Sequence, residues 1–308
     1  MGNCIKTERR LSHELDFAVV EDLIDDWAGN YSYAEYTSYN STLTQPCHST
    51  YCSNLIGSIP AFLAVAGALG VLCNVALGIT VAVCLRLWDQ AGLLLATLSA
   101  ALFAAVLPFF AVGVGQGWIF GDAFCQTARA VEHGCLFAQG LLVAGSVCQI
   151  SKALPGVLLN IILWLMGFLL AIPAALISST GEDGWAVCIP NQGDELRLWS
   201  LAHAIFCLAI FDILPVVVAL ANVVLKWQRL GWHPPMVITW LFYLLWAPYG
   251  VALILDMLLK MGLLTPTCSL RERFDYFLGL SEGLGVFHCF LCPLLILGAV
   301  IHHHRAAQ

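Results

Sequence analysis

Seven apolar stretches, each long enough to cross a lipid bilayer, constrain this chain more than any other feature. A membrane-spanning helix needs about 20 predominantly apolar residues. We expect spans near residues 58–85, 91–114, 124–150, 153–178, 195–225, 234–261 and 271–301. Composition agrees, because 60% of the 308 residues are hydrophobic and only 11% are charged, against roughly 25% charged in a soluble domain. The sequence therefore predicts an all-α membrane protein, a seven-transmembrane helix bundle.

The orientation of the bundle rests on modification signals and charge. An odd number of spans puts the two termini on opposite sides, and sequons at Asn30 and Asn40 favour an N-terminus outside and a C-terminus inside. The positive-inside rule supports this orientation only weakly. We expect an extracellular tail over 1–56, the bundle over 57–301 and a short cytoplasmic tail over 302–308. We expect no cleavable signal peptide, because residues 1–56 lack an apolar core of sufficient length.

The predicted tail is strongly acidic. Residues 1–56 hold eight acids and three bases, which accounts for −5 of the net charge of −7. Such a segment excludes a nucleic-acid partner, and it is either a capture site for a basic partner or a solvated, disordered terminus. The candidate contacts are Glu14, Asp16, Glu21, Asp22, Asp25, Asp26, Glu35, Tyr31 and Tyr36. Tyr31, Tyr33, Tyr36 and Tyr39 are candidates for sulfation.

Several acids lie inside the predicted spans, and those away from the span ends are Glu132, Asp212, Asp256 and Glu282. Ionisable groups at such depth are costly and normally face the bundle interior or a wet cavity. By helical rise, Glu132, Asp256 and Glu282 fall in the outer half of the membrane, and Asp212 falls nearer the middle. One interpretation is an anionic pocket formed by the three outer acids for a basic ligand terminus. The other is that neutral carboxyls hydrogen-bond neighbouring helices, at ~0.6–2 kcal/mol per contact.

Motifs on several spans resemble those of a known family. The segments "LPFFAVGVGQGWIFGDAFC" (107–125), "FYLLWAPYG" (242–250) and "SEGLGVFHCFLCP" (281–293) resemble motifs of chemokine receptors, which are rhodopsin-like seven-helix receptors. "MGNC" at the start, "ELDF" (14–17), "PCHS" (46–49) and "CLAIF" (207–211) resemble the atypical chemokine receptors of the Duffy type. The resemblance implies a receptor of the plasma membrane and endosomes. It also implies binding of several basic inflammatory chemokines, which are scavenged, buffered or transcytosed without G-protein signalling.

Six cysteines fall on the expected outer face, where the medium is oxidising: Cys4, Cys47, Cys52, Cys125, Cys188 and Cys268. The resemblance implies a disulfide between Cys125 and Cys188, as in most receptors of this class. It also implies a disulfide between Cys47 and Cys268, as in chemokine receptors. Cys52 competes with Cys47 for the second bond.

Three polar groups that signalling relatives use as a switch are missing. The resemblance predicts an Asn-Pro-x-x-Tyr motif in the last span, where this chain has Cys292 before Pro293 and Ile296 three residues after it. Residues 149–151 are Gln-Ile-Ser where relatives have Asp-Arg-Tyr, and Ala100 stands where they keep a sodium-binding aspartate. Without such contacts a ligand has no two-state element to bias, so we expect no productive G-protein coupling.

Pro293 itself lies in the middle of an apolar run. Proline removes one helical hydrogen bond, and in membrane helices neighbouring groups satisfy the freed carbonyl.

Two other functions remain open. One is an ordinary signalling peptide receptor coupled to G proteins. The other is a channel or transporter, which would need a polar path through the whole bilayer. Enzymatic activity is not expected, because the chain has no His-Glu-x-x-His motif and no convincing pair of facing aspartates. We expect no cofactor and no metal, and we interpret the histidines at 302–304 as a solvated helix end. Homo- and hetero-oligomers both remain open.

Overall fold

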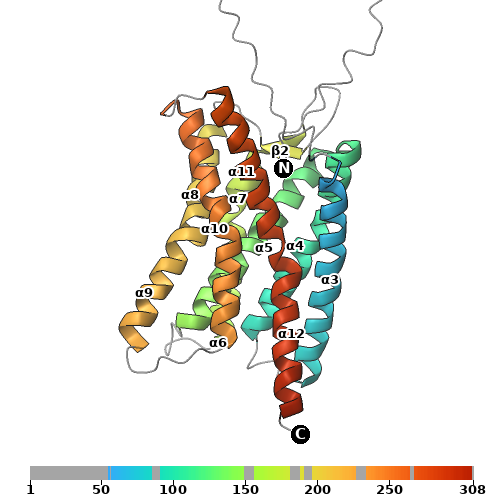
Figure 1. The fold of residues 1–308 in the computed structure, drawn as a ribbon, viewed down its shortest axis with the longest axis vertical. Helices are drawn as coiled ribbons and strands as arrows, with labels where there is room; N and C mark the ends of the chain where they lie inside the picture. The colour runs from blue at the N-terminus through green and yellow to red at the C-terminus, as the bar shows by residue number, and fades with distance from the viewer. Residues whose placement is uncertain are drawn as a thin grey trace, which may run out of the picture.

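The computed structural model describes residues 55, 57–84, 91–148, 156–180, 188–190, 196–226, 234–263 and 267–306. Within these residues the chain forms a bundle of helices that run back and forth along one direction (Figure 1). The helices are α3 (Ile59–Cys84), α4 (Ala91–Gln116), α5 (Asp122–Cys148), α6 (Gly156–Leu170), α7 (Ile172–Ile177), α8 (Arg197–Leu208), α9 (Leu214–Lys226), α10 (Pro234–Lys260), α11 (Cys268–Val286) and α12 (His288–Ala306). A π-helix, η4 (Ala209–Ile213), joins α8 to α9.

A short antiparallel hairpin caps one end of the bundle. It consists of β1 (Ser178–Thr180) and β2 (Cys188–Pro190), with Ser178 opposite Pro190. The helix α3 begins at this hairpin end, and α12 finishes at the opposite end (Figure 1).

The prediction of a helical membrane bundle is confirmed. Six of the described helical segments are long and apolar enough to cross a membrane: Ile59–Val83, Ala91–Gln116, Gly156–Ile177, Arg197–Ala221, Trp240–Leu259 and Cys268–Ile301. The remaining predicted span corresponds to α5, which at 27 residues is also long enough. It is less apolar because it carries Arg129, Glu132 and His133, all of which face the protein interior. Since α5 packs against α4, α6, α7, α9 and α10, it is the central helix of the bundle.

Pro293 is accommodated by a contact from a neighbouring helix. Proline at this position leaves the carbonyl oxygen of Cys289, four residues earlier, without its helical partner. Asn74 on α3 fills the gap, because its Nδ2 donates to the Cys289 oxygen at 2.7 Å and to the Gly70 oxygen at 2.8 Å. Gly70 has room only for hydrogen, since a Cβ there would lie 2.8 Å from the Cys289 sulfur. The hydrogen bond from Asn74 to the carbonyl that Pro293 leaves free therefore joins α3 to α12.

Three interruptions were not predicted from the sequence. The fourth span, expected over 153–178, is divided at Ala171 into α6 and α7. The last span, expected as one helix over 271–301, is divided at Phe287 into α11 and α12. The fifth span, expected over 195–225, contains the π-helix η4. Pro215 follows η4 by two residues, and its ring would crowd the carbonyl of Phe211 in a regular helix. A wider turn relieves that crowding.

Aromatic side chains fill the middle of the bundle around Trp246 of α10, which is 1% exposed. Its ring stacks on Phe211 at a centroid distance of 5.5 Å and meets Phe103 edge-on at 6.0 Å. Its Nε1 donates to Nδ1 of His288 at 3.0 Å. The contacts of Trp246 thus join α10 to η4, α4 and α12 at one depth of the bundle.

Candidate functional site

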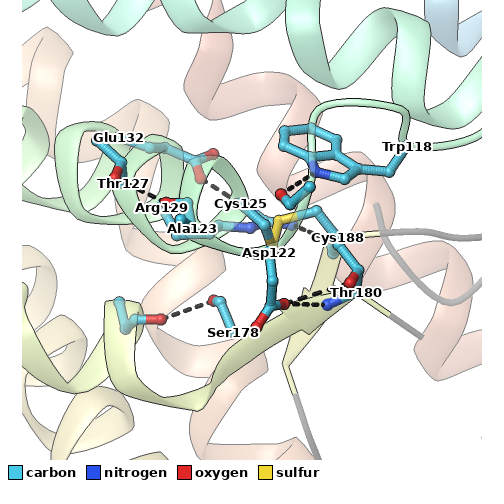
Figure 2. Close-up of a disulfide and its surroundings, with 12 residues drawn as sticks. Trp118, Asp122, Ala123, Cys125, Thr127, Arg129, Glu132, Ser178, Thr180 and Cys188 are labelled. Carbon is cyan, nitrogen blue, oxygen red and sulfur yellow. Dashed lines mark hydrogen bonds and ion pairs between the residues drawn. A yellow bond between two sulfur atoms is a disulfide. The ribbon is translucent and has the colours of Figure 1, made fainter. Parts of the chain in front are cut away.

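A disulfide fixes the hairpin over the start of α5. Cys125 is bonded to Cys188, the pair that the resemblance implied. Asp122, in the first turn of α5, adds a second attachment, because its Oδ1 accepts a hydrogen bond from the Thr180 backbone nitrogen at 2.8 Å (Figure 2). The hairpin is therefore held to the helix bundle by a covalent bond and by polar contacts.

A cavity lies beneath this hairpin. It is lined by residues of α3, α4, α5 and α11, by the loop before α5 and by β2: Leu63, Leu107, Phe110, Gly113, Val114, Trp118, Arg129, Glu132, Cys188, Glu282 and Val286. Its volume is ≈ 30 Å³, whereas a single water needs roughly 10–15 Å³. The cavity admits a pair of waters or an ammonium-sized group, and a larger group enters only if the walls move.

Trp118 forms the wall next to the hairpin. Its indole nitrogen donates to the Gly121 oxygen at 2.9 Å (Figure 2), and both Gly117 and Gly121 have positive φ angles, which suits glycine. Gly113 lets the ring lie flat on α4, since a Cβ there would lie 2.8 Å from a ring carbon.

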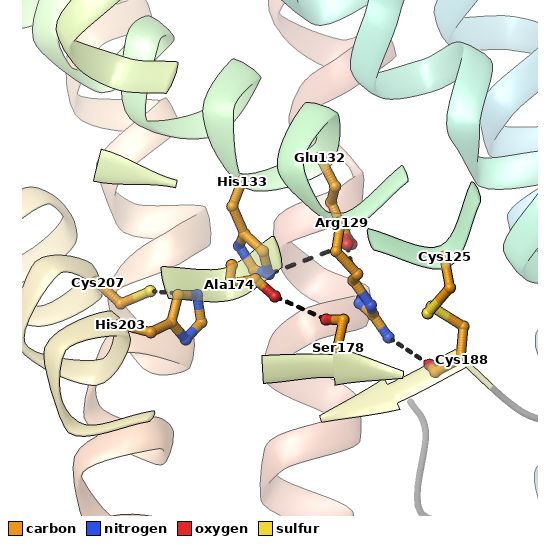
Figure 3. Close-up of polar contacts among 9 residues, drawn as sticks. All are labelled: Cys125, Arg129, Glu132, His133, Ala174, Ser178, Cys188, His203 and Cys207. Atoms are coloured by element: carbon orange, nitrogen blue, oxygen red, sulfur yellow. Dashed lines mark hydrogen bonds and ion pairs between the residues drawn. A yellow bond between two sulfur atoms is a disulfide. The ribbon is translucent and has the colours of Figure 1, made fainter. Parts of the chain in front are cut away.

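Arg129 is the polar centre of the cavity. Its Nη1 donates to Oε2 of Glu132 at 2.8 Å, and its Nη2 donates to the Cys188 backbone oxygen at 3.2 Å (Figure 3). The guanidinium also lies 4.6 Å from the ring centroid of Phe110, an attractive cation–π geometry. One hydrogen-bond donor of this cation is unused, because its Nε is buried without a partner.

The structure brings two of the three predicted pocket acids into one cavity, Glu132 and Glu282. With Arg129 they carry a formal charge of −1 when all three are ionised, because the guanidinium offsets one carboxylate. The site is therefore an ion-paired cavity with one acid in excess, and it is less anionic than the sequence suggested. It suits a small cation that carries a hydrogen-bond acceptor close by, for which the Arg129 Nε is a free donor.

Asp256, the third predicted pocket acid, is not among the cavity's lining residues. It lies on α10, and that helix contributes no wall to the cavity. On the α8 and α10 side, the space next to Glu132 is filled by other side chains. The rings of His133 and His203 lie 4.5 Å apart, and His203 Nε2 lies 3.6 Å from the Cys207 sulfur (Figure 3). Asp256 thus lies outside the set of side chains that line the cavity.

Sequence reasoning missed Arg129. The available signal was its spacing, because residues three apart on a helix are neighbours and Arg129 precedes Glu132 by three. The contact with the Cys188 carbonyl has no such local signal, since it joins residues 59 positions apart.

Several predicted site residues lie outside the described residues. They include the acidic and tyrosine positions of the tail, the sequons at Asn30 and Asn40, and Cys47 with its competitor Cys52. Cys268 is disulfide-bonded, but the pairing with Cys47 stays a prediction. Among the side chains that the structure describes, no three His, Cys, Asp or Glu groups are placed to hold a metal ion.

The fold and this site define a class: a multi-pass helical membrane protein with a disulfide-anchored hairpin over a polar cavity. Comparison with known proteins narrows it. No protein-family model matches the chain. Atypical chemokine receptor 1 of Gorilla gorilla gorilla is 31% identical over 328 residues, covering 100% of this chain and 93% of that protein. The proteins of the same name from Saimiri boliviensis boliviensis and Homo sapiens are 33% and 31% identical, each over 96% of this chain and 90% of theirs.

This chain belongs to the atypical chemokine receptor family. The relatives bear out the resemblance to receptors of the Duffy type. The family is one of receptors and not of enzymes.

Proposed function

We propose that this protein is an atypical receptor that binds several basic inflammatory chemokines and scavenges, buffers or transcytoses them without G-protein signalling. In this proposal the tail 1–56 and the hairpin face the extracellular side of the plasma membrane. Residues 302–308 face the cytoplasm, and receptor with bound ligand enters endosomes.

Two features support a basic ligand. The tail between Glu14 and Tyr39 has seven acids and no Lys or Arg, so it attracts a basic protein over a Debye length of about 8–10 Å. The cavity has one acid in excess of its cation, and Glu282 lines it from α11. Long-range attraction by the tail and short-range contact with the cavity together favour capture of basic ligands of several kinds.

The observation that carries the proposal lies in the half of the bundle away from the hairpin. Ala100 is buried, 5% exposed, where the resemblance predicts an aspartate. The amide nitrogen of Asn74 donates to the backbone oxygens of Gly70 and Cys289. Its Oδ1 is buried without a partner among the described residues. Contacts to backbone oxygens hold α3 and α12 in one arrangement, whereas a polar switch needs side-chain groups that change partners.

A signalling receptor is the second candidate. Pro248 lies inside α10 and Trp246 packs on Gly285 of α11, so the machinery for a moving α10 is still present on that side of the bundle. This alternative differs from the proposal only in the response to bound ligand.

The two candidates are separated by measuring binding and signalling on the same membranes. Labelled chemokines of several kinds should bind saturably and displace one another, while chemokine-stimulated GTP loading stays at the level of untransfected membranes. A signalling chemokine receptor expressed at equal density is the positive control. Robust GTP loading in membranes that hold only this receptor would promote the second candidate, and absence of saturable binding would reject both.

A further inference from the structure

We propose that His288 is a two-state element at the centre of the bundle, whose imidazole hydrogen-bonds either to Trp246 of α10 or to the backbone of Gly285 on α11. The position of the ring proton selects the partner. A ligand that enters the cavity shifts this choice toward Trp246, and that step alone rests on the proposed function.

One ring nitrogen of His288 has two partners with opposite requirements. The indole Nε1 of Trp246 lies 3.0 Å from Nδ1, and the Gly285 backbone oxygen lies 2.8 Å from the same nitrogen. An indole nitrogen can only donate and a carbonyl oxygen can only accept. Nδ1 would therefore have to be an unprotonated acceptor toward Trp246 and a protonated donor toward Gly285. It cannot be both at once, so the two hydrogen bonds exclude each other.

Neither tautomer of His288 satisfies all of these polar groups. With the proton on Nε2, Nδ1 accepts from Trp246, and the Nε2–H group is buried with no acceptor in the part of the chain that the structure describes. With the proton on Nδ1, the ring donates to Gly285, and the indole N–H of Trp246 loses its acceptor. Each state thus makes one of the two bonds and leaves one buried N–H group unpaired. The two states are therefore close in free energy, and both are populated.

Neighbouring rings keep the imidazole in place. His288 is 1% exposed, and its ring centroid lies 4.9 Å from that of Phe103 and 5.4 Å from that of Phe242. The switch is therefore a change of proton position with little movement of the ring. A water molecule that reaches the ring takes the proton from one nitrogen while it gives a proton to the other, so the number of protons on the ring is unchanged.

Gly285 connects this choice of partner to the cavity. It lies on α11 between Glu282 and Val286, both of which line the cavity, whereas α10 contributes no wall. The cavity volume is ≈ 30 Å³, so a larger group enters only if the walls move. Outward displacement of α11 takes the Gly285 oxygen away from His288 and leaves Trp246 as the partner. The ligand thereby strengthens the link between α10 and α12, which suits a receptor that binds without signalling.

The test is nuclear magnetic resonance of the full-length receptor in nanodiscs, with its histidines labelled at both ring nitrogens. The chemical shifts of Nδ1 and Nε2 report which nitrogen carries the proton. The chain has 9 histidines, so His288→Gln identifies the His288 signals by their loss. We expect both tautomers in the receptor without ligand, neither exceeding the other by more than about tenfold.

Two variants separate hydrogen bonding from packing. Trp246→Phe removes the indole donor and keeps an aromatic ring, so His288 should carry its proton only on Nδ1. Phe103→Leu alters the packing around His288 without removing a hydrogen-bond partner, and both tautomers should remain. Phe103 and Trp246 are 0% and 1% exposed, so the two variants disturb equally buried positions.

Addition of a chemokine that binds saturably to the same nanodiscs should raise the ratio of Nε2–H to Nδ1–H about threefold. A single tautomer in the receptor without ligand, or the same response to Trp246→Phe and Phe103→Leu, would overturn the proposal. An unchanged ratio with bound chemokine would overturn the link to the cavity. Failure of every chemokine to bind would reject the proposed function instead, and the measurements without ligand would still decide whether His288 has two states.

Discussion

Arg129 decides how much negative charge the cavity can offer a ligand. Its guanidinium is bonded to Glu132 at 2.8 Å and lies between that acid and the Cys188 carbonyl. Glu132 is therefore already neutralised within the protein. Glu282 also lines the cavity and interacts electrostatically with Arg129, so the cavity holds two acids and one cation.

Glu282→Gln should consequently weaken chemokine binding about three- to tenfold, on the order of 1 kcal/mol. The reason is that it removes one negative charge from the cavity and leaves the Arg129–Glu132 pair intact. Competition binding on intact cells measures this. Asp256→Asn is the matched control, since it neutralises a span acid outside the cavity. Equal effects of the two variants would show that the cavity makes no specific contact with the ligand.

The two predicted disulfides should have different roles. Cys125→Ser breaks a bond that fixes the hairpin to α5, so we expect surface expression to fall severalfold. Cys268→Ser, at the start of α11, should impair ligand binding while leaving expression largely intact, because the predicted bond to Cys47 only ties down the tail. Surface antibody staining and ligand binding on the same cells distinguish the two. Mass mapping that finds Cys47 and Cys268 unlinked would contradict the pairing.

The sequence predicted which acids line the cavity better than it predicted the residues that surround those acids. Glu132 and Glu282 could be named because a carboxyl inside an apolar run is rare and costly. That Glu132 and Glu282 line one cavity and Asp256 does not depends on how helices that are distant in sequence pack together. Sequence spacing carries no information of that kind.

The contact between α5 and α6 depends on a glycine. A Cβ on Gly167 would overlap the backbone of Ala138, whereas nothing lies within 4 Å of one added to Gly78 on α3. Gly167→Ala should therefore lower the free energy of unfolding by about 1–3 kcal/mol, and Gly78→Ala should leave it unchanged or raise it slightly. Thermal unfolding of the detergent-solubilised protein compares them. A stable Gly167→Ala variant would mean that the two helices can separate without cost.

The acidic tail should act mainly on the rate of capture. Deleting residues 14–39 removes seven acids and no Lys or Arg, so we expect at least a tenfold loss of chemokine affinity and a weaker dependence of the association rate on salt. Surface plasmon resonance on receptor in nanodiscs measures both. Replacing the seven acids by Asn or Gln keeps the chain length and should have the same effect on affinity, and unchanged affinity after deletion of 14–39 would remove the capture role.

Helix positions could be predicted closely, but their interruptions could not. The third span was expected over 124–150 and is Asp122–Cys148, because the length of an apolar run is a direct consequence of bilayer thickness. The π-helix at Ala209–Ile213 and the break at Phe287 add or remove one hydrogen bond within an unbroken apolar sequence. Of these two interruptions, only the π-helix has a signal in the sequence, which is Pro215 two residues after it.

The bundle as observed is tied across its middle at three places along α10. Tyr243 donates its hydroxyl to the Gly140 oxygen at 2.7 Å, Trp246 donates to His288, and Gly250 receives the carboxyl of Asp212. These contacts link α10 to α5, α12 and η4 in turn. An outward swing of α10 would have to break all three, which agrees with a receptor that binds ligand without passing on a signal.

The hydrogen bond from Arg129 to the Cys188 carbonyl makes the hairpin and the cavity a thermodynamically coupled pair. Binding free energies are linked reciprocally, so whatever factor a cavity ligand imposes on the hairpin is imposed back on that ligand. An antibody fragment that binds the hairpin more tightly when Arg129 is hydrogen-bonded to it must lower the affinity of any ligand that breaks this bond. The ligand lowers the affinity of the antibody fragment by the same factor. Affinity at the cavity can thus be adjusted from the surface without entering it.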